Sequence, residues 1–302
     1  MIPWKDATIH ALSHVVHYGS CVFEGIRAYR TDKGPAFFRL DEHLRRMIDS
    51  ARIYRMNVAY SVEELKAACH EVITANDLES AYIRPFAFYG YDSLGVLPNP
   101  DSVKVMVAAF EWGAYLGEEG LNIGVDVGVS SWNRPAPNTF PTMAKAACNY
   151  MPGQLMVNEA RRHGYVEGIA LDSRGYLSEG PGENLFIVRD GVIFTPSLEN
   201  ALLAGITRDS IIKLARHLGY EVREQVLPRE MLYVADELFF SGTAAEVTPI
   251  RSVDGMQVGA GRRGPVTEAI QTAFFDLVNG RSDVFSEWLE VVETNRFAAA
   301  GV

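Results

Sequence analysis

Two hydrophobic periods alternate along this sequence, and they restrict the fold to one that combines helices with sheets. In residues 41–56, apolar side chains recur every three or four residues, as they do on one face of a helix. Residues 61–75 are expected to form a second helix, because Ser61 and Glu64 have the spacing of a capping box. Two strands are expected to follow, at 81–89 and 103–110. The first part of the chain is therefore predicted to be a mixed α+β unit.

The second part of the chain carries strand periodicity and closely spaced turn signals. Ile123, Val125, Val127 and Val129 alternate with small or polar residues, which predicts a strand. Helices are expected at 151–163, ended by Gly164, and from a cap at Thr207 to about Leu218, with Gly219 beyond its end. Hairpin turns are expected at Asp190-Gly191 and Asp254-Gly255. Residues 113–120 are rich in glycine and charge, so we place the domain boundary there, with a small domain at 1–116 and a larger one at 117–302.

Composition excludes several classes of protein. The net charge of −10 argues against a nucleic-acid or anionic-membrane surface, because both need a basic patch. The 3 cysteines have no CxxC spacing, which indicates unpaired thiols in a reducing compartment and neither a disulfide framework nor a zinc site. No apolar run has the length of a membrane span, and the N-terminus lacks a signal-peptide core. We expect a cytoplasmic protein without a metal centre.

Lys145 is the side chain that most strongly suggests chemistry. It stands in Met143-Ala144-Lys145-Ala146-Ala147, among small and apolar residues. Burial of an ammonium is costly unless the group is used, and burial readily converts a lysine into a neutral nucleophile that forms Schiff bases. Lys145 is therefore the first candidate for a catalytic residue.

Three further segments have both a structural and a functional interpretation. The turn at 178–184 carries Glu179 and Glu183, which form either a solvated acidic turn or a carboxylate that pairs with a cationic ring nitrogen. The start of a helix near 204–209 attracts phosphate, although most helix starts bind only water. The turn at 241–246 offers backbone N–H groups to a ligand.

Tyr82 and Arg84 lie two residues apart on an expected strand, so they share one face. An arginine beside a tyrosine suits a carboxylate ligand. Together with a Schiff-base lysine, a carboxylate and a phosphate-binding helix start, this pair completes the groups that a pyridoxal-phosphate enzyme acting on amino acids needs. In contrast, the GxGxxG match at 259–264 lacks a βαβ frame and is interpreted as a turn into the last helix.

The sequence resembles the bacterial branched-chain amino acid aminotransferases, which belong to the fold-type-IV class of pyridoxal-phosphate enzymes. The resemblance rests on ordered runs that cover nearly the whole chain: 17–29 (HYGSCVFEGIRAY), 80–85 (SAYIRP), 111–117 (EWGAYLG), 130–139, 144–150 (AKAACNY), 159–172 (EARRHGYVEGIALD), 178–186 (SEGPGENLF), 205–215 (GITRDSIIKLA) and 241–255 (SGTAAEVTPIRSVDG). It implies the two-domain, mixed α+β fold of the D-amino acid aminotransferase type, with a larger C-terminal domain that binds the cofactor.

The resemblance also implies roles for particular residues. Lys145 would form the Schiff base with pyridoxal 5′-phosphate, Glu179 would pair with its ring nitrogen, and Tyr150 would hydrogen-bond its phenolic oxygen. The phosphate would be held by four residues: Arg46, Ile206, Thr207 and Thr243. The substrate pocket would be lined by eight: Tyr18, Phe23, Tyr82, Arg84, Trp112, Tyr115, Ala244 and Ala245.

The implied activity is amino-group transfer from leucine, isoleucine or valine to 2-oxoglutarate, in the biosynthesis of these amino acids, by a homodimer or a trimer of such dimers. Other activities of the same fold type stay open, namely a D-amino acid aminotransferase, an (R)-amine transaminase or an aminodeoxychorismate lyase. A pyridoxal-phosphate carrier without enzymatic activity is disfavoured by Lys145, Glu179 and Tyr150. This sequence departs from the family in Ala146-Ala147-Cys148, where glycine is expected, and in starting after the family's first short strand.

Overall fold

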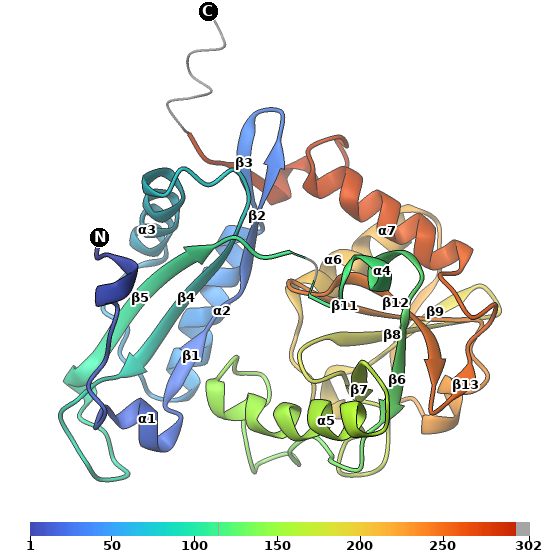
Figure 1. Cartoon of the computed structure of the whole chain (residues 1–302), viewed down its shortest axis with the longest axis horizontal. Coiled ribbons are helices and arrows are strands. Elements are labelled where there is room, and N and C mark those ends of the chain that lie inside the picture. The colour runs from blue at the N-terminus through green and yellow to red at the C-terminus, as the bar shows by residue number, and fades with distance from the viewer. Residues whose placement is uncertain (114, 294–302) are drawn as a thin grey trace, which may run out of the picture. The chain divides into compact units, whose positions relative to one another are not determined.

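The structure, a computed structural model, describes residues 1–113 and 115–293, which form two compact units (Figure 1). Of the described residues, the first unit contains Met1–Trp112, Ala144–Cys148 and 278–293. The second contains Gly113–Met143 and Asn149–Leu277. The five residues around Lys145 therefore belong to the first unit, although their neighbours on both sides in the sequence belong to the second. The boundary expected after residue 116 stays a prediction, because compactness alone does not show which part folds independently.

The first unit is an antiparallel sheet covered by helices. β4 (Ala81–Tyr89) pairs along one edge with β5 (Val103–Phe110) and along the other with β1 (Cys21–Phe23) and β2 (Ile26–Thr31). β3 (Gly34–Phe38) and β14 (Leu289–Val291) continue the sheet beyond β2. The helices of this unit are α1 (His14–Tyr18), α2 (Leu40–Ile53) and α3 (Val62–Ala75), and a short 3₁₀ turn, η1 (Trp4–Asp6), precedes them.

The apolar side chains that α2 and α3 bury against the sheet stabilise these helices. Leu44 of α2 and Leu65 and Ile73 of α3 pack with Ile26 and Ile83 of the sheet, and all five side chains are at most 3% exposed. Ser61 caps α3 as predicted: its hydroxyl accepts from the Glu64 amide at 3.2 Å, and the Glu64 carboxylate accepts from the Ser61 amide at 2.8 Å. Helix periodicity and capping thus led to the correct elements here.

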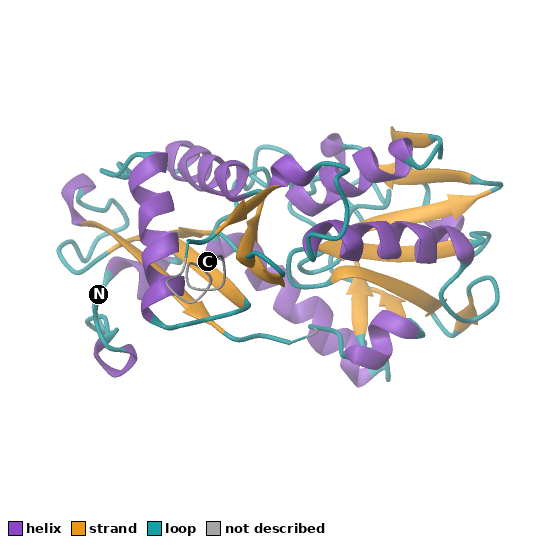
Figure 2. Cartoon of the chain, turned by 90° about the horizontal axis from the view of Figure 1, so that it is seen from above, coloured by secondary structure: helices purple, strands orange, loops and turns teal. Residues whose placement is uncertain are grey.

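The second unit is built on a mixed sheet in the order β10-β9-β8-β11-β12-β6-β7, with β13 paired to β12. In Figure 2, helices lie alongside the strands of this sheet. The strands are β6 (Val125–Val129), β7 (Glu167–Ile169), β8 (Asn184–Arg189), β9 (Val192–Pro196), β10 (Val222–Gln225), β11 (Glu237–Gly242), β12 (Glu246–Val253) and β13 (Met256–Gln257). The helices are α4 (Glu118–Asn122), α5 (Met151–Arg162), α6 (Ile206–His217) and α7 (Pro265–Val278). The remaining 3₁₀ turns of the chain are η2 (Pro100–Ser102), η3 (Ala147–Tyr150), η4 (Leu198–Asn200), η5 (Arg229–Leu232) and η6 (Ser286–Trp288).

Turn chemistry fixes two hairpins of the second sheet. Asp190 and Gly191 have φ of +50° and +75°, and Asp254 and Gly255 have φ of +51° and +78°. Positive φ at both central residues is the signature of a type I′ turn, which matches the twist of the flanking strands. Both hairpin predictions are confirmed. The turn predicted at 259–264 is also confirmed, because α7 begins directly after it.

Four predicted boundaries were wrong. The helix expected at 41–56 is α2, which ends at Ile53. α6 begins at Ile206 and is capped by Gly205, so Thr207 already lies inside the helix. The strand expected from Ile123 begins at Val125, because Ile123 has helical backbone angles (φ −101°, ψ −39°) at the end of α4. The segment 113–120, expected to be a connector, contains the beginning of α4.

The described residues include no helix that is both long and apolar enough to cross a membrane. They also include no group of three or more His, Cys, Asp and Glu side chains that could hold a metal ion.

Replacement of Phe239 by alanine should strongly destabilise the second unit. Phe186 and Phe239 stack at 4.9 Å between ring centroids with an interplanar angle of 2°, and both rings are 0% exposed. Loss of a buried phenylalanine side chain costs about 3–5 kcal/mol. Urea unfolding of Phe239→Ala should show this loss, whereas Phe140→Ala, at a ring 46% exposed, should change stability by roughly 0.5 kcal/mol or less. Similar losses for the two variants would contradict this view of the core.

Candidate active site

Lys145 is held against the first strand of the first unit. Its amide donates to the Ser50 hydroxyl at 2.9 Å, and its carbonyl accepts from the Phe23 amide at 3.0 Å. Ala144 and Ala146 are each 1% exposed, while Lys145 itself is half-buried. Its Nζ lies 4.9 Å from the centre of the Phe23 ring. The backbone of Lys145 is thus fixed on both sides, and its amine lies near an aromatic ring.

A buried carboxylate, Glu24, directly follows Phe23 and binds two residues of α2. Its side chain is 0% exposed and accepts from Arg46 twice, at 2.6 Å from Nε and 2.8 Å from Nη2. His43 Nδ1 lies 2.7 Å from the same carboxylate. Burial alone would raise the pKa of Glu24, but Arg46 and His43 outweigh it and hold this pKa well below its usual range. Burial lowers the pKa of His43, so we describe this histidine as neutral.

Arg84 and Tyr82 share a face of β4, as their alternation predicts. The Arg84 guanidinium lies 4.9 Å from the Phe23 ring and 5.2 Å from the Tyr82 ring. Tyr82 also packs edge-on against Trp112 at 4.5 Å. A Cβ at Gly25 would lie 1.8 Å from the Tyr82 hydroxyl, so glycine is required there for the tyrosine to reach this position. Within the described residues, the buried Nε of Arg84 has no hydrogen-bond partner.

The acidic turn of the second unit is buried, so its interpretation as a solvated turn was wrong. Glu179 is 5% exposed and Glu183 is 3% exposed. Oε1 of Glu179 accepts from Arg134 Nη2 at 2.9 Å. Oε2 accepts from Asn184 Nδ2 at 3.0 Å and from the Leu203 amide at 3.1 Å. Glu179 is therefore a buried carboxyl group that is bonded directly to a guanidinium group.

The start of α6 lies close to this carboxylate. A Cβ on Gly205 would lie 2.0 Å from Oδ1 of Asn184, whose amide group binds Glu179. This contact explains why a glycine without a capping side chain stands at the N-cap, where Thr207 had been expected. Ile206 and Thr207 follow in the first turn and are 8% and 3% exposed. Helix starts of this kind bind anions through their backbone N–H groups.

The turn at 243–245 follows β11, and a buried hydroxyl lies near the end of this strand. Ser241 is 0% exposed, and its Oγ has no hydrogen-bond partner in the part of the chain that the structure describes. Ser241 pairs with Asn184 across β11 and β8, and Asn184 pairs with Glu179 across an isolated bridge. Paired residues of neighbouring antiparallel strands point to the same face. Glu179, Asn184 and Ser241 therefore form one row of polar side chains.

The predicted site residues divide between the two units. Tyr18 lies on α1, where its hydroxyl donates to the Leu94 carbonyl at 3.1 Å, and Tyr150 ends η3. In the first unit lie Tyr18, Phe23, Arg46, Tyr82, Arg84, Trp112 and Lys145. In the second lie Tyr115, Tyr150, Glu179, Ile206, Thr207, Thr243, Ala244 and Ala245. Sequence patterns gave no indication of Glu24, His43, Arg134 or Asn184, since each is recognised only by its tertiary partner.

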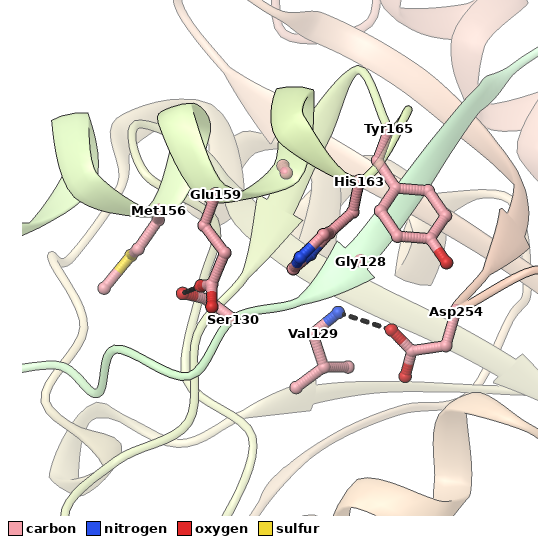
Figure 3. A pocket seen from close by; sticks show the side chains of 9 residues that line it. Gly128, Val129, Ser130, Met156, Glu159, His163, Tyr165 and Asp254 are labelled. Atoms are coloured by element: carbon pink, nitrogen blue, oxygen red, sulfur yellow. Dashed lines mark hydrogen bonds between the residues drawn. The ribbon is translucent and has the colours of Figure 1, made fainter.

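A separate cavity of about 180 Å³ in the second unit contains none of the predicted residues (Figure 3). Glu159, His163, Tyr165 and Asp254 line it. Glu159 accepts hydrogen bonds from the Ser130 hydroxyl at 2.5 Å and the Ser131 amide at 2.9 Å, and Asp254 accepts from the Val129 amide at 2.8 Å. Both carboxylates therefore accept hydrogen bonds from residues of the cavity wall itself, and these bonds give each carboxylate a structural role.

The first unit holds a lysine among small apolar residues, and the second holds a buried carboxylate beside the start of a helix. A group-transfer enzyme that binds a phosphorylated ring needs groups of these kinds. The comparison with known families agrees. The chain belongs to the family described as Amino-transferase class IV, whose model matches residues 21–253.

Individual relatives are similar over almost their full length. The chain is 59% identical over 295 residues to a branched-chain-amino-acid aminotransferase of Salmonella typhimurium, covering 97% of this chain and 96% of the relative. It is 60% identical to the crystal structure of the Escherichia coli branched-chain amino acid aminotransferase, with a TM-score of 0.95 and 97% of each chain covered. It is 34% identical to the branched-chain amino acid aminotransferase from Thermobaculum terrenum in its PLP-form, with a TM-score of 0.90 and coverage of 97% and 95%. The predicted family, the fold class and the assignment as an aminotransferase are confirmed.

The stability that Glu24 contributes to the folded protein should decrease as the pH falls. Because the pKa of Glu24 is lowered in the folded protein, its contribution is present above the ordinary glutamate value, about 4.3, and is lost as the pH falls through the folded value. At neutral pH, Glu24→Gln should cost about 3 kcal/mol, because Arg46 loses its counter-charge. Urea unfolding at a series of pH values should show the difference from wild type shrinking below about pH 4.

The control for this experiment is Glu63→Gln, at an exposed glutamate of α3. This variant should follow the wild-type pH profile throughout. A difference between wild type and Glu24→Gln that stays constant down to about pH 3 would show that folding does not lower the pKa of Glu24.

Proposed function

We propose that this protein transfers amino groups between leucine, isoleucine or valine and 2-oxoglutarate, with pyridoxal 5′-phosphate as cofactor and Lys145 as catalytic residue. One observation carries the proposal: three cationic side chains from distant parts of the sequence converge on Phe23-Glu24. Lys145 Nζ and the Arg84 guanidinium each lie 4.9 Å from the Phe23 ring, and Arg46 binds Glu24 at 2.6 Å. Such a group of an amine and two guanidinium groups suits a ligand that carries phosphate and carboxylate.

The residues present fit this cofactor. A buried anion, Glu179, suits a protonated ring nitrogen, and Arg134 supplies the counter-charge that favours its ionised form. The glycine-capped start of α6 and the unpartnered Ser241 hydroxyl, among the described residues, suit a phosphate. Arg46, Ile206, Thr207 and Thr243 would hold the phosphate, and Tyr150 would donate to the phenolic oxygen.

Lys145 would perform the proton transfers. When bound, pyridoxal 5′-phosphate supplies an aldehyde carbon that bonds to amines and a ring that accepts electrons from the substrate. Nζ of Lys145 would take the proton from the substrate Cα and would return it at C4′ of the cofactor. The Phe23 ring, 4.9 Å from Nζ, would help to position the amine for this transfer.

Substrate recognition would have an aromatic and a cationic part. Phe23, Tyr82 and Trp112 offer apolar surface in the first unit, which suits aliphatic side chains. Arg84, with a buried Nε that lacks a partner among the described residues, suits the distal carboxylate of glutamate. Tyr18, Tyr115, Ala244 and Ala245 would complete the pocket. The name of each relative reported above, a branched-chain-amino-acid aminotransferase, supports this substrate class.

We propose further that the protein forms a homodimer, alone or as a trimer of dimers, in the cytoplasm. The segment before α1 exposes apolar side chains that a second copy could cover: Met1 is 72% exposed, Ile2 57% and Trp4 76%. Among the residues that the structure describes, no disulfide joins Cys21, Cys69 or Cys148, which suits a reducing compartment.

Lys145→Ala should lose transamination and covalent attachment of the cofactor. The phosphate contacts remain, so the variant should still bind pyridoxal 5′-phosphate noncovalently. Borohydride reduction followed by mass spectrometry should label the peptide that contains Lys145 in wild type and leave the variant unlabelled. Lys104→Ala is the control, because Lys104 lies on β5 and should leave labelling unchanged. Turnover at the wild-type rate in Lys145→Ala would refute the assignment.

Arg84→Ala should impair recognition of 2-oxoglutarate more than recognition of leucine. A charge-assisted hydrogen bond contributes roughly 1.5–3 kcal/mol, so the KM for 2-oxoglutarate should rise about ten- to a hundredfold. The leucine half-reaction, followed separately by cofactor absorbance, should stay within about a few-fold of wild type, since apolar contacts carry it. Equal losses in the two half-reactions would mean that Arg84 binds the α-carboxylate common to both substrates, or that it acts structurally.

A further inference from the structure

Arg134 is a buried arginine at which three segments of the second unit meet. The residue is 5% exposed, and its side chain donates to three acceptors. Nη2 lies 2.9 Å from Oε1 of Glu179, Nε lies 3.3 Å from the Ala201 carbonyl, and Nη1 lies 3.4 Å from the Asn149 carbonyl. The Arg134 amide in turn donates to the Leu171 carbonyl at 2.8 Å. The guanidinium is therefore fixed in position and orientation.

We propose that Arg134 is a positioning residue, which fixes the orientation of the Glu179 carboxylate and keeps it ionised toward the ring nitrogen of the cofactor. This inference rests on the function proposed above, which assigns Glu179 to that nitrogen. Arg134 itself touches neither substrate nor cofactor in this proposal. It acts only through Glu179 and through the segments that it joins.

The division of contacts on Glu179 supports an orienting role. Arg134 binds Oε1, while Asn184 and the Leu203 amide bind Oε2. Donors on both oxygens define the plane of the carboxylate, because rotation about its terminal bond would break at least one of these hydrogen bonds. The rigid fork of the guanidinium adds directional control that a lysine ammonium would lack.

The charge of Arg134 determines whether the proton between Glu179 and the ring nitrogen of the cofactor lies on the nitrogen or on the carboxylate. When a carboxylate faces a ring nitrogen, one proton can lie on either partner, and the stronger base holds it. A directly bonded guanidinium stabilises the carboxylate, which leaves the proton on the nitrogen. Without Arg134, the buried carboxylate becomes the stronger base, and the proton moves from the ring nitrogen toward Glu179.

The other contacts of Arg134 lead to two further parts of the proposed site. Asn149 directly precedes Tyr150, the residue proposed to bind the phenolic oxygen. Ala201 lies two residues before Leu203, whose amide binds Glu179. One side chain thus links the Glu179 turn, the start of α5 and the loop that leads to α6. Loss of the Arg134 guanidinium should therefore weaken the contacts among all three segments.

The test measures the ring nitrogen directly. Each protein is loaded with pyridoxal 5′-phosphate labelled with ¹⁵N in the ring, and its ¹⁵N chemical shift is followed against pH, because this shift reports protonation of the nitrogen. Arg134→Met should move the shift at neutral pH toward the unprotonated value, and Arg134→Lys should restore part of the difference. The dissociation constant of the cofactor should rise about tenfold or more in Arg134→Met.

Two comparisons separate this role from a structural one. Arg251→Met removes a different arginine of the same unit, which binds Asp126 at 2.7 Å, and should leave the ¹⁵N shift unchanged. In a Glu179→Gln background, Arg134→Met should cause no further change in the shift, because its effect passes through the carboxylate. If Arg134→Met does not fold, Arg134→Gln takes its place, since the amide can still donate hydrogen bonds but carries no charge.

The outcomes distinguish the inference from the function on which it rests. An unchanged ¹⁵N shift in the Arg134 variant, with a normal response of Glu179→Gln, would overturn the role of Arg134 alone. An unchanged shift in Glu179→Gln would overturn the assignment of Glu179 to the ring nitrogen, and with it this part of the proposed function. An additive effect of Arg134→Met in the Glu179→Gln background would show that Arg134 acts by another route.

Discussion

The burial of two glutamates beside two arginines is the constraint on which both halves of the candidate site depend. Glu24 binds Arg46 in the first unit, and Glu179 binds Arg134 in the second, with both carboxylates at most 5% exposed. Neither carboxylate could stay ionised in such surroundings without its partner, because desolvation of a lone charge costs several kcal/mol. Each pair therefore sets where charge can reside in its own unit, and the neighbouring side chains adapt to it.

Most of the secondary structure and the importance of Lys145 could be predicted from the sequence, because both depend on residues close together in the chain. β4 and β5 have the predicted bounds, and the Ser61 cap and two type I′ turns were read from residues next to one another. The acidic turn at Glu179 was ambiguous from the sequence, since burial depends on what covers it. The resemblance to a family favoured a cofactor-binding carboxylate there and also pointed to Arg46 in an arginine-rich helix, and both roles stay predictions.

The errors and omissions arose where a tertiary contact outweighed a local preference. Thr207 carries a hydroxyl that could cap a helix, yet α6 begins one residue earlier with Gly205 at its N-cap, where Asn184 leaves no room for a Cβ. Glu24 and Arg134 were missed for a related reason, since a lone glutamate between β1 and β2 and a lone arginine in a proline-rich loop carry no periodic signal. Their partners lie 22 and 45 positions away in the sequence, a separation that no local pattern can reveal.

Ala144–Cys148 belong to the first unit, and this has a consequence for the order in which the chain folds during its synthesis. A ribosome releases the N-terminal strands first, but the first unit also requires residues 144–148 and β14, which ends at Val291. The part of the protein that emerges earliest is therefore the part that is finished last. Contacts over such long stretches of chain form slowly. Until synthesis ends, β3 presents an unpaired edge, which makes the nascent chain a natural client for chaperones that shield open strands.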